Sequence, residues 1–357
     1  METEQVDSLP TLLDILDKIS EAEESFRNNK RWGILSNLGM EDKFEIVPIS
    51  PKGTCILRPT FYSYNKYFRG QTAFYQNCTP SIFRKDEDNK RDSIDIFIDR
   101  LRSCEFELLL KTHPVVKKLN KGIRIDKLGL DLSIKVDYKG LAQHYELNTN
   151  IIDFTNNKWV AAFFAACKKK EDKYIPIDPK EDDNEEIGVF YTYSQPPDQL
   201  GGKLNNTRLS VIGLQPFSRP VEQKGFSLHM DKGENLNNIR GIDRLKFRHD
   251  KLVNEIIYNR MNHGRLLFPY DKIEEFADKL KNIKEISNEA FNLAYKRYNC
   301  KNIKKVKIRE LCKNKDISFV DRPVITFSKS IKRKFLEKWE SKGKKEFHSK
   351  LVYRPIF

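Results

Sequence analysis

The chain has 357 residues, 39% of them hydrophobic, and a formal net charge of +14, which together indicate a globular protein larger than an average single domain. No apolar run reaches about 18 residues, so we expect no membrane span, and the acidic start lacks the basic region of a secretory signal. The six scattered cysteines form no CxxC pair, so we expect free thiols, no bound metal and a cytoplasmic location.

The first predicted elements are one helix and two strands. Apolar residues at helical spacing predict a helix within 8–29, with Pro10 in its first turn. Two segments rich in β-branched and aromatic residues, interrupted by Pro and Gly, predict strands near 43–48 and 64–69.

A long amphipathic helix is expected next, from Ser93 to a stop before Pro114. "GLAQHYEL" then predicts a short helix and "NTNIIDF" a strand. "KWVAAFFAACKKK" is apolar almost all round and has a basic end, so it predicts a core helix. The N-cap candidates of this helix are Thr155, Asn156 and Asn157.

The remaining chain mixes strands, helices and a polar segment. The acidic segment 170–186 predicts an exposed, mobile loop, and strands are expected at "IGVFYTY" and "LSVIGLQP". "RPVEQKGFSLHM" predicts a turn leading into a strand, and two helices follow, one ending at Gly264 and one starting after Pro269. We therefore predict an α+β fold with a mixed or mostly antiparallel central sheet flanked by helices, and a basic C-terminal extension.

The segment Phe68-Arg69-Gly70-Gln71 ends one of the predicted strands. A planar guanidinium can grip phosphate or carboxylate, and a glycine lets another backbone or a ligand approach closely. A structural salt bridge would explain the same arginine. From these residues alone, both interpretations remain open.

A second group of polar residues comprises Gln143, His144 and Asp153, around a turn and a strand that runs into the apolar helix. Polar groups at such a junction can line a cleft, and a histidine can act as an acid or base near neutral pH. A hydrogen-bonded core histidine and a helix-capping aspartate are the alternatives.

A third group comprises Arg219, Glu222 and Gln223, which precede Gly225, with His229 further on. A carboxylate beside an amide near a glycine turn can stabilise a developing positive charge or orient a nucleophile. An ordinary hairpin would explain the same residues.

In order and spacing, these segments resemble the FRG-domain family, which is named for its Phe/Tyr-Arg-Gly motif. The matching segments are "FRGQ", "PSIFR", "LAQHYELNTNIIDFTNNKWVAAFFA", "RPVEQKGFSLH" and "RLLFPYDKIEEFADKL". The resemblance implies an N-terminal helix with leading strands over 1–59, an FRG domain over 60–282, and a basic extension over 283–357.

The second motif departs from the family pattern at three positions. Glu146 stands where the family usually has Gly, Asn150 where it has Arg, and Phe154 where it has Trp. With asparagine there, the chain lacks the anion-binding contact that the family's arginine implies.

A looser similarity to arginine-type ADP-ribosyltransferases implies NAD as the bound molecule. In that scheme Arg69 grips the pyrophosphate, His144 or Tyr145 contacts the ribose or nicotinamide, and Glu222 or Gln223 acts near the ribosyl cation. The implied catalytic residues are His144, Glu222 and Gln223. The implied ligand-binding residues are Arg69, Gly70, Gln71, Gln143, Tyr145, Asp153 and Arg219.

Two elements of the transferase pattern are missing from this sequence. It has no Ser-Thr-Ser strand and no clear Glu-x-Glu turn. Glu105 and Glu107 have the right spacing, but they fall in the long amphipathic helix, where we expect them on the solvated face. The family resemblance also implies a role in bacterial or phage conflict, as a toxin or in anti-phage defence.

The basic extension supports an alternative, a non-catalytic module that binds nucleic acid or a protein. Over 301–357, Lys and Arg outnumber Asp and Glu by 18 to 6. Aromatic residues among these lysines could stack on bases, although the four-residue spacing of Ile331, Phe335 and Trp339 more simply predicts a helix face that packs on the body. The candidate nucleic-acid contacts are Lys332, Arg333, Lys334, Lys344 and Lys345.

A nuclease is a third interpretation, because histidine and basic residues can serve phosphodiester chemistry, but no spacing in the sequence selects it. The partners we expect are thus a nucleotide or nucleic acid, with a protein partner or a second copy of the chain left open.

Overall fold

In the computed structural model, the predicted α+β class is confirmed. The structure describes residues 6–29, 43–48, 53–60, 66–84, 91–125, 130–171, 173–180, 186–194, 208–214, 216–298 and 300–353. Its α-helices are α1 (Leu12–Asn28), α3 (Ser93–Lys111), α4 (Pro114–Lys121), α5 (Tyr138–His144), α6 (Lys158–Ala166), α8 (Ser218–Glu222), α9 (Lys251–Arg260), α10 (Lys272–Lys281), α11 (Asn288–Arg297), α12 (Lys305–Lys313), α13 (Lys329–Lys338) and α14 (Lys344–Ser349).

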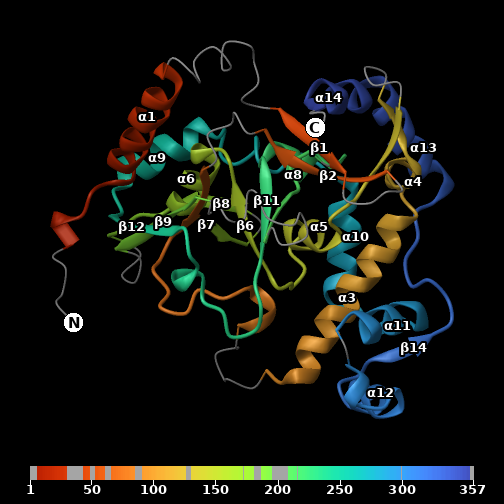
Figure 1. Cartoon of the computed structure of the whole chain (residues 1–357). Coiled ribbons are helices and arrows are strands. Elements are labelled where there is room, and N and C mark those ends of the chain that lie inside the picture. Colours follow the sequence, from red (N-terminus) through yellow and green to blue (C-terminus); the bar gives the residue numbers. More distant parts are fainter. Residues whose placement is uncertain are drawn as a thin grey trace.

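A six-stranded antiparallel sheet lies at the centre of the molecule (Figure 1), in the order β10-β11-β6-β3-β9-β12. Its strands are β3 (Lys66–Gln71), β6 (Ile151–Thr155), β9 (Ile187–Ser194), β10 (Leu209–Val211), β11 (Gly225–His229) and β12 (Ile242–Arg248). Sequence analysis placed β3 near 64–69, of which residues 64 and 65 lie outside the described part of the chain.

Both faces of the central sheet are buried. Successive strand residues point to opposite faces, so Tyr67 joins one hydrophobic cluster and Phe68 the other. Helices α1, α6 and α9 cover the face of Phe68, where buried leucines and isoleucines of α1 meet the alanines and phenylalanines of α6. Helix α6 is buried almost all round, as its composition predicted. Burial on both sides fixes the register of β3 and therefore the position of Arg69.

A second, mixed sheet has the order β15-β1-β2-β5-β4, and its edge strand β15 ends the described chain. Its strands are β1 (Phe44–Pro48), β2 (Thr54–Pro59), β4 (Ile123–Ile125), β5 (Leu130–Ile134) and β15 (Leu351–Tyr353), with β15 parallel to β1. Two short pairs complete the strands, β7 (Cys167–Lys170) with β8 (Lys173–Pro176) and β13 (Glu285–Ser287) with β14 (Ser318–Val320).

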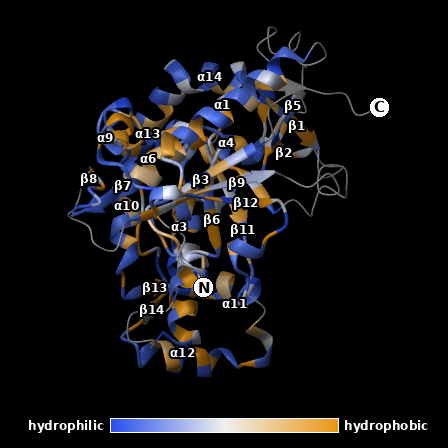
Figure 2. Ribbon diagram, turned by 90° about the vertical axis from the view of Figure 1, so that its left-hand side faces the viewer, coloured by the Kyte–Doolittle hydropathy of each residue, from blue (hydrophilic) through white to orange (hydrophobic). Residues whose placement is uncertain are grey.

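Helix α3 connects this body to α11 and α12, which lie with β13 and β14 at the opposite end of the molecule from α14 (Figure 2). The expectation that Glu105 and Glu107 face solvent is wrong, because both are buried against α11. Glu107 forms a two-pronged ion pair with Arg297 and a third bond with Lys111, while Glu105 accepts from the backbone N–H of Ser287. These carboxylates hold α3 against the start and the end of α11.

Three local predictions differ from the structure. Helix α1 begins after a capping box between Thr11 and Asp14, which leaves Pro10 before the cap. The basic end of "KWVAAFFAACKKK" is strand β7 instead of helix. Its partner β8 lies in the segment 170–186 that we expected to be an exposed loop, of which 172 and 181–185 lie outside the described residues. Tyr174 of β8 stacks on Phe268 and packs on Phe163 of α6, so this strand lies against the body of the protein.

Two further boundaries are shifted. "RPVEQ" forms the short helix α8 instead of a plain turn, and β11 follows as predicted. Helix α9 ends at Arg260, and turns carry the chain on to Gly264, whose φ of 82° favours glycine.

No helix in the described ranges is both long enough and apolar enough to cross a membrane.

Candidate functional site

A cavity of about 680 Å³ opens where β3, β6, α5, α6 and the β7–β8 pair meet. This volume lies in the range of small-molecule sites. Eight of the sequence-predicted site residues line it: Arg69, Gly70, Gln71, Gln143, His144, Asp153, Arg219 and Gln223. Residues more than 150 positions apart are therefore brought together by the antiparallel pairing of β3, β6 and β11.

Arg69 has no ion-pair partner among the described residues. Its Nη1 donates to the main-chain oxygen of Asp153 at 3.1 Å, and its Nε is buried without a partner in the described structure. A buried donor without an acceptor is costly, which favours an arginine that holds an anion over a structural salt bridge.

Arg84 is a second arginine on the same cavity, and it was not among the predicted site residues. Its Nε donates to the main-chain oxygen of Thr79, and no carboxylate in the described ranges pairs with it. Partial desolvation and, next, the positive charge of Arg69 lower the pKa of Arg84. Two guanidinium groups beside one cavity repel each other and create a positive potential there.

The buried ring of His144 is oriented by Gln223. The Nε2 of Gln223 donates to the main-chain oxygen of Leu267 at 3.2 Å, so its Oε1 faces Nδ1 of His144, also at 3.2 Å. Because an amide oxygen only accepts, Nδ1 of His144 must carry a proton. The amide orientation follows from this hydrogen-bond network. Nε2 is therefore the unprotonated nitrogen of the neutral ring, and it is buried.

Asp153 lies beside that nitrogen. Its Oδ1 is 3.4 Å from Nε2 of His144, and the carboxylate is partly exposed at the cavity. Neither atom has a hydrogen-bond partner in the described structure. A proton on Nε2 would be donated to this carboxylate oxygen.

Two glycines fix this geometry. A Cβ at Gly70 would lie 2.0 Å from the main-chain oxygen of Ala161, so Gly70 allows α6 to pack on β3. A Cβ at Gly225 would lie 2.4 Å from Cε1 of His144, so Gly225 makes room for the ring. The glycine after Arg69 therefore admits a helix backbone, which is one of the two roles predicted for it.

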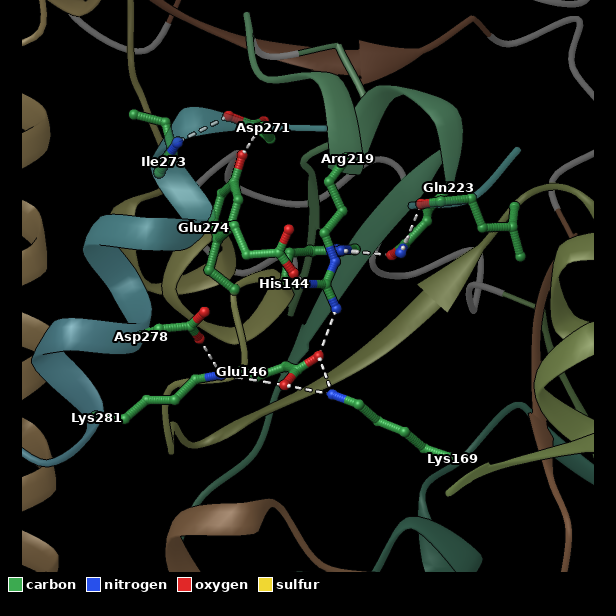
Figure 3. Close-up of polar contacts among 12 residues, drawn as sticks. His144, Glu146, Lys169, Arg219, Gln223, Asp271, Ile273, Glu274, Asp278 and Lys281 are labelled. Carbon is green, nitrogen blue, oxygen red and sulfur yellow. Dashed lines mark hydrogen bonds and ion pairs between the residues drawn. The ribbon is translucent and has the colours of Figure 1, made fainter. Parts of the chain in front are cut away.

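Glu146 and Arg219 line one end of the cavity, where they form an ion pair (Figure 3). The carboxylate of Glu146 lies 2.8 Å from Nη2 of Arg219, 3.2 Å from Nζ of Lys169 and 3.1 Å from Nζ of Lys281. Burial raises the pKa of Glu146, but the hydrogen bond and charge of Arg219 outweigh it and lower that pKa to about 2. Arg219 also pairs with Glu274.

Two predicted site residues do not line the cavity. Tyr145 is buried in the core and donates to Asp271 at 2.6 Å, so it is not placed to contact a ligand there. Glu222 is exposed at the end of α8. The acidic groups that do face the cavity are Asp153 and Glu146.

Gln143 and Gln71 stabilise the cavity wall. Oε1 of Gln143 accepts from the hydroxyl of Thr149 at 2.6 Å, which fixes the turn before β6. Oε1 of Gln71 accepts from Sγ of Cys78 at 3.5 Å. Asn150, at the position of the missing arginine, donates to the main chain of Met230 and does not line the cavity.

The aromatic residues of the basic extension are largely buried. Phe327, Trp339 and Phe347 belong to the main hydrophobic cluster, and Phe335 packs on His113, so the predicted packing face is confirmed. They are not available for base stacking. The candidate nucleic-acid residues on α13 and α14 remain partly or fully exposed: Lys332, Arg333, Lys334, Lys344 and Lys345.

Sequence reasoning missed Arg84, Lys169 and Tyr174 as cavity residues. The sequence did offer a clue to Arg84, because this residue ends the "PSIFR" segment that supported the family resemblance. Lys169 and Tyr174 had none, since a β-hairpin was not recognised there.

The family model described as the FRG domain matches residues 64–174, which confirms the resemblance over that part of the chain. The match includes Arg69, His144 and Asp153 but ends before Arg219 and Gln223. No curated protein and no solved structure matches the chain.

Proposed function

We propose that the cavity binds an anionic, nucleotide-like ligand and that Arg69 and Arg84 hold its phosphate groups. The observation that supports this most directly is that two arginines line one cavity without a carboxylate partner among the described residues. A guanidinium offers five donors in a plane, which suits bidentate contact with phosphate oxygens. The aromatic and aliphatic residues of the wall, such as Phe164, offer a surface for a base or sugar.

The reaction we propose for this site is cleavage of an N-glycosidic bond, with NAD as the substrate. Breaking that bond places positive charge on the ribose, which a nearby carboxylate stabilises. In the sequence scheme Glu222 or Gln223 had this role. Glu222 does not line the cavity and Gln223 carries no charge, so we assign the role to Asp153. Nicotinamide leaves with the electron pair of the broken bond, and water bonds to the ribose carbon in its place. Nε2 of His144 would accept the proton that this water loses, and Gln223 acts as the positioning residue for the ring.

The proposal is tested in two steps on the full chain. Isothermal titration with ADP-ribose, NAD, ADP and nicotinamide should show binding of the phosphate-bearing molecules and none of nicotinamide alone. Nicotinamide release from NAD should then be abolished in Asp153→Asn and His144→Asn, with ADP-ribose still bound. If ADP-ribose binds but NAD is not cleaved, the cavity is a binding site without the proposed reaction.

The alternative is nucleic-acid binding through the basic extension. The exposed lysines of α13 and α14 can neutralise phosphates, but stacking by Phe327, Trp339 and Phe347 is excluded by their burial. This alternative predicts affinity that falls steeply with salt and is lost in a Lys332→Gln, Lys334→Gln, Lys345→Gln variant. We also propose, from the family resemblance alone, that the protein acts in bacterial or phage conflict.

A further inference from the structure

The backbone of Glu146 is in the left-handed region, with φ 64°, which costs free energy for any residue with a side chain. In this conformation its carboxylate contacts Arg219 at the end of the cavity that the two residues line. The free-energy cost of this backbone conformation must be offset by contacts of the Glu146 side chain. The partners in those contacts indicate the role of Glu146.

The compensation comes from three cations on three different elements. Arg219 comes from α8, Lys169 from β7 and Lys281 from α10, and their nitrogens lie 2.8 to 3.2 Å from the Glu146 oxygens (Figure 3). Because the pKa of Glu146 is lowered to about 2, its carboxylate stays ionised at neutral pH. The three cations surround it as they would surround a bound anion.

The other acidic partners of these cations lie outside the cavity. Glu274 pairs with Arg219 and Asp278 pairs with Lys281, and neither residue lines the cavity. Lys169 has no other carboxylate partner in the described ranges. Glu146 is thus the acidic group that neutralises Arg219 and Lys169 on the cavity side.

We propose that Arg219 and Lys169 form a second anion subsite, that Glu146 fills it with its own carboxylate, and that the cavity consequently selects ligands charged at one end only. This inference rests on the proposed function for the first end, where Arg69 and Arg84 hold phosphate. The favoured class is a nucleotide whose phosphates lie together, such as NAD or ADP-ribose. A nucleotide with an additional phosphate at its far end meets the Glu146 carboxylate, and like charges in a partly buried site repel.

The test uses inorganic pyrophosphate as the probe in isothermal titrations of the full chain at low ionic strength. Glu146→Gln keeps the size of the side chain and removes its charge. Glu146→Gly is a second variant that suits the backbone, since glycine adopts a positive φ without strain. Glu274→Gln is the matched control, because it removes the other carboxylate from the same guanidinium outside the cavity. Thermal melts establish that each variant is folded.

We expect wild type and Glu274→Gln to bind one pyrophosphate. Both Glu146 variants should bind a second pyrophosphate, at least about tenfold more tightly than wild type binds a second one. In the same variants the preference for NAD over NADP should fall by at least about tenfold. An unchanged stoichiometry in both Glu146 variants, or an equal gain in Glu274→Gln, overturns the second subsite. If wild type binds no pyrophosphate while Glu146→Gln binds one, the second subsite stands and the proposed function fails.

Discussion

Arg69 and Arg84 line the same cavity, and the charge of Arg69 contributes to the lowered pKa of Arg84. Neither guanidinium forms an ion pair with a carboxylate in the described part of the chain. Electrostatic repulsion between the two side chains is relieved when an anion binds between them, so ligand binding should stabilise the folded protein by mass action.

The first prediction concerns the proton of His144. When the ring is neutral, its proton should be on Nδ1, because Oε1 of Gln223 can only accept. In Gln223→Leu this acceptor is lost, and the tautomer protonated at Nε2 should increase because Asp153 accepts there. Nitrogen chemical shifts of labelled histidine distinguish the tautomers. An unchanged tautomer ratio in Gln223→Leu would show that Gln223 does not orient the ring.

The second prediction concerns the contact between Gly70 and α6. Gly70→Ala places a methyl group 2.0 Å from the main-chain oxygen of Ala161, so we expect a loss of about 3 kcal/mol in the free energy of unfolding. Gly53→Ala is the control, because it has a positive φ but no atom within 4 Å, and should cost about 1 kcal/mol. Urea unfolding measures both. Equal losses would mean that close packing on α6 is not the reason for this glycine.

The third prediction concerns pH and His113, which is buried among Phe217, Phe327 and Phe335. Burial lowers the pKa of His113 from 6.5 to about 3. The unfolded chain therefore binds a proton that the folded chain excludes, and stability is fully present above about pH 6.5 and lost as pH falls toward 3.

Between pH 7 and pH 5, this histidine should lower the free energy of unfolding by about 2 kcal/mol. His113→Asn removes the titrating ring and keeps a side-chain acceptor for the backbone N–H of Val115. Its unfolding free energy should vary less over this pH range than that of wild type, whatever its absolute stability. If the unfolding free energy of His113→Asn varies with pH as much as that of wild type, His113 is not the source of this pH dependence.

The fourth prediction separates packing from charge in the basic extension. Trp339 is 5% exposed and packs on Phe347, so Trp339→Ala should cost about 3 to 5 kcal/mol. Arg333→Gln changes an exposed residue and should alter stability by less than about 0.5 kcal/mol. Deleting the extension would therefore unfold part of the body, and single charge changes are the better test of nucleic-acid binding. Equal effects of the two substitutions would contradict this packing.

Periodicity was sufficient to predict α3, the core position of α6 and most strands of the central sheet, because burial on defined faces leaves a strong pattern in these segments. The β7–β8 hairpin was missed because three consecutive lysines show no alternation. Its position depends on the stacking of Tyr174 on Phe268, nearly 100 residues later.

The site was predicted in part for a similar reason. Ordered motifs identified Arg69, His144, Asp153 and Gln223, which converge on one cavity. Single-residue patterns could not show that Tyr145 turns into the core or that Glu146 adopts a positive φ and binds Arg219. Both facts depend on partners that are distant in sequence.

The most direct test of the anion site is the affinity of ADP-ribose for wild type, Arg84→Gln and Arg333→Gln, measured by isothermal titration at low ionic strength. Arg84 lies at the cavity and Arg333 on the exposed surface of α13, so the two substitutions remove the same charge at different places. We predict that Arg84→Gln weakens binding by at least about tenfold, that Arg333→Gln leaves it within about twofold of wild type, and that the loss shrinks as salt is added. An affinity of Arg84→Gln equal to that of wild type, or equal losses in both variants, would contradict the proposed phosphate site.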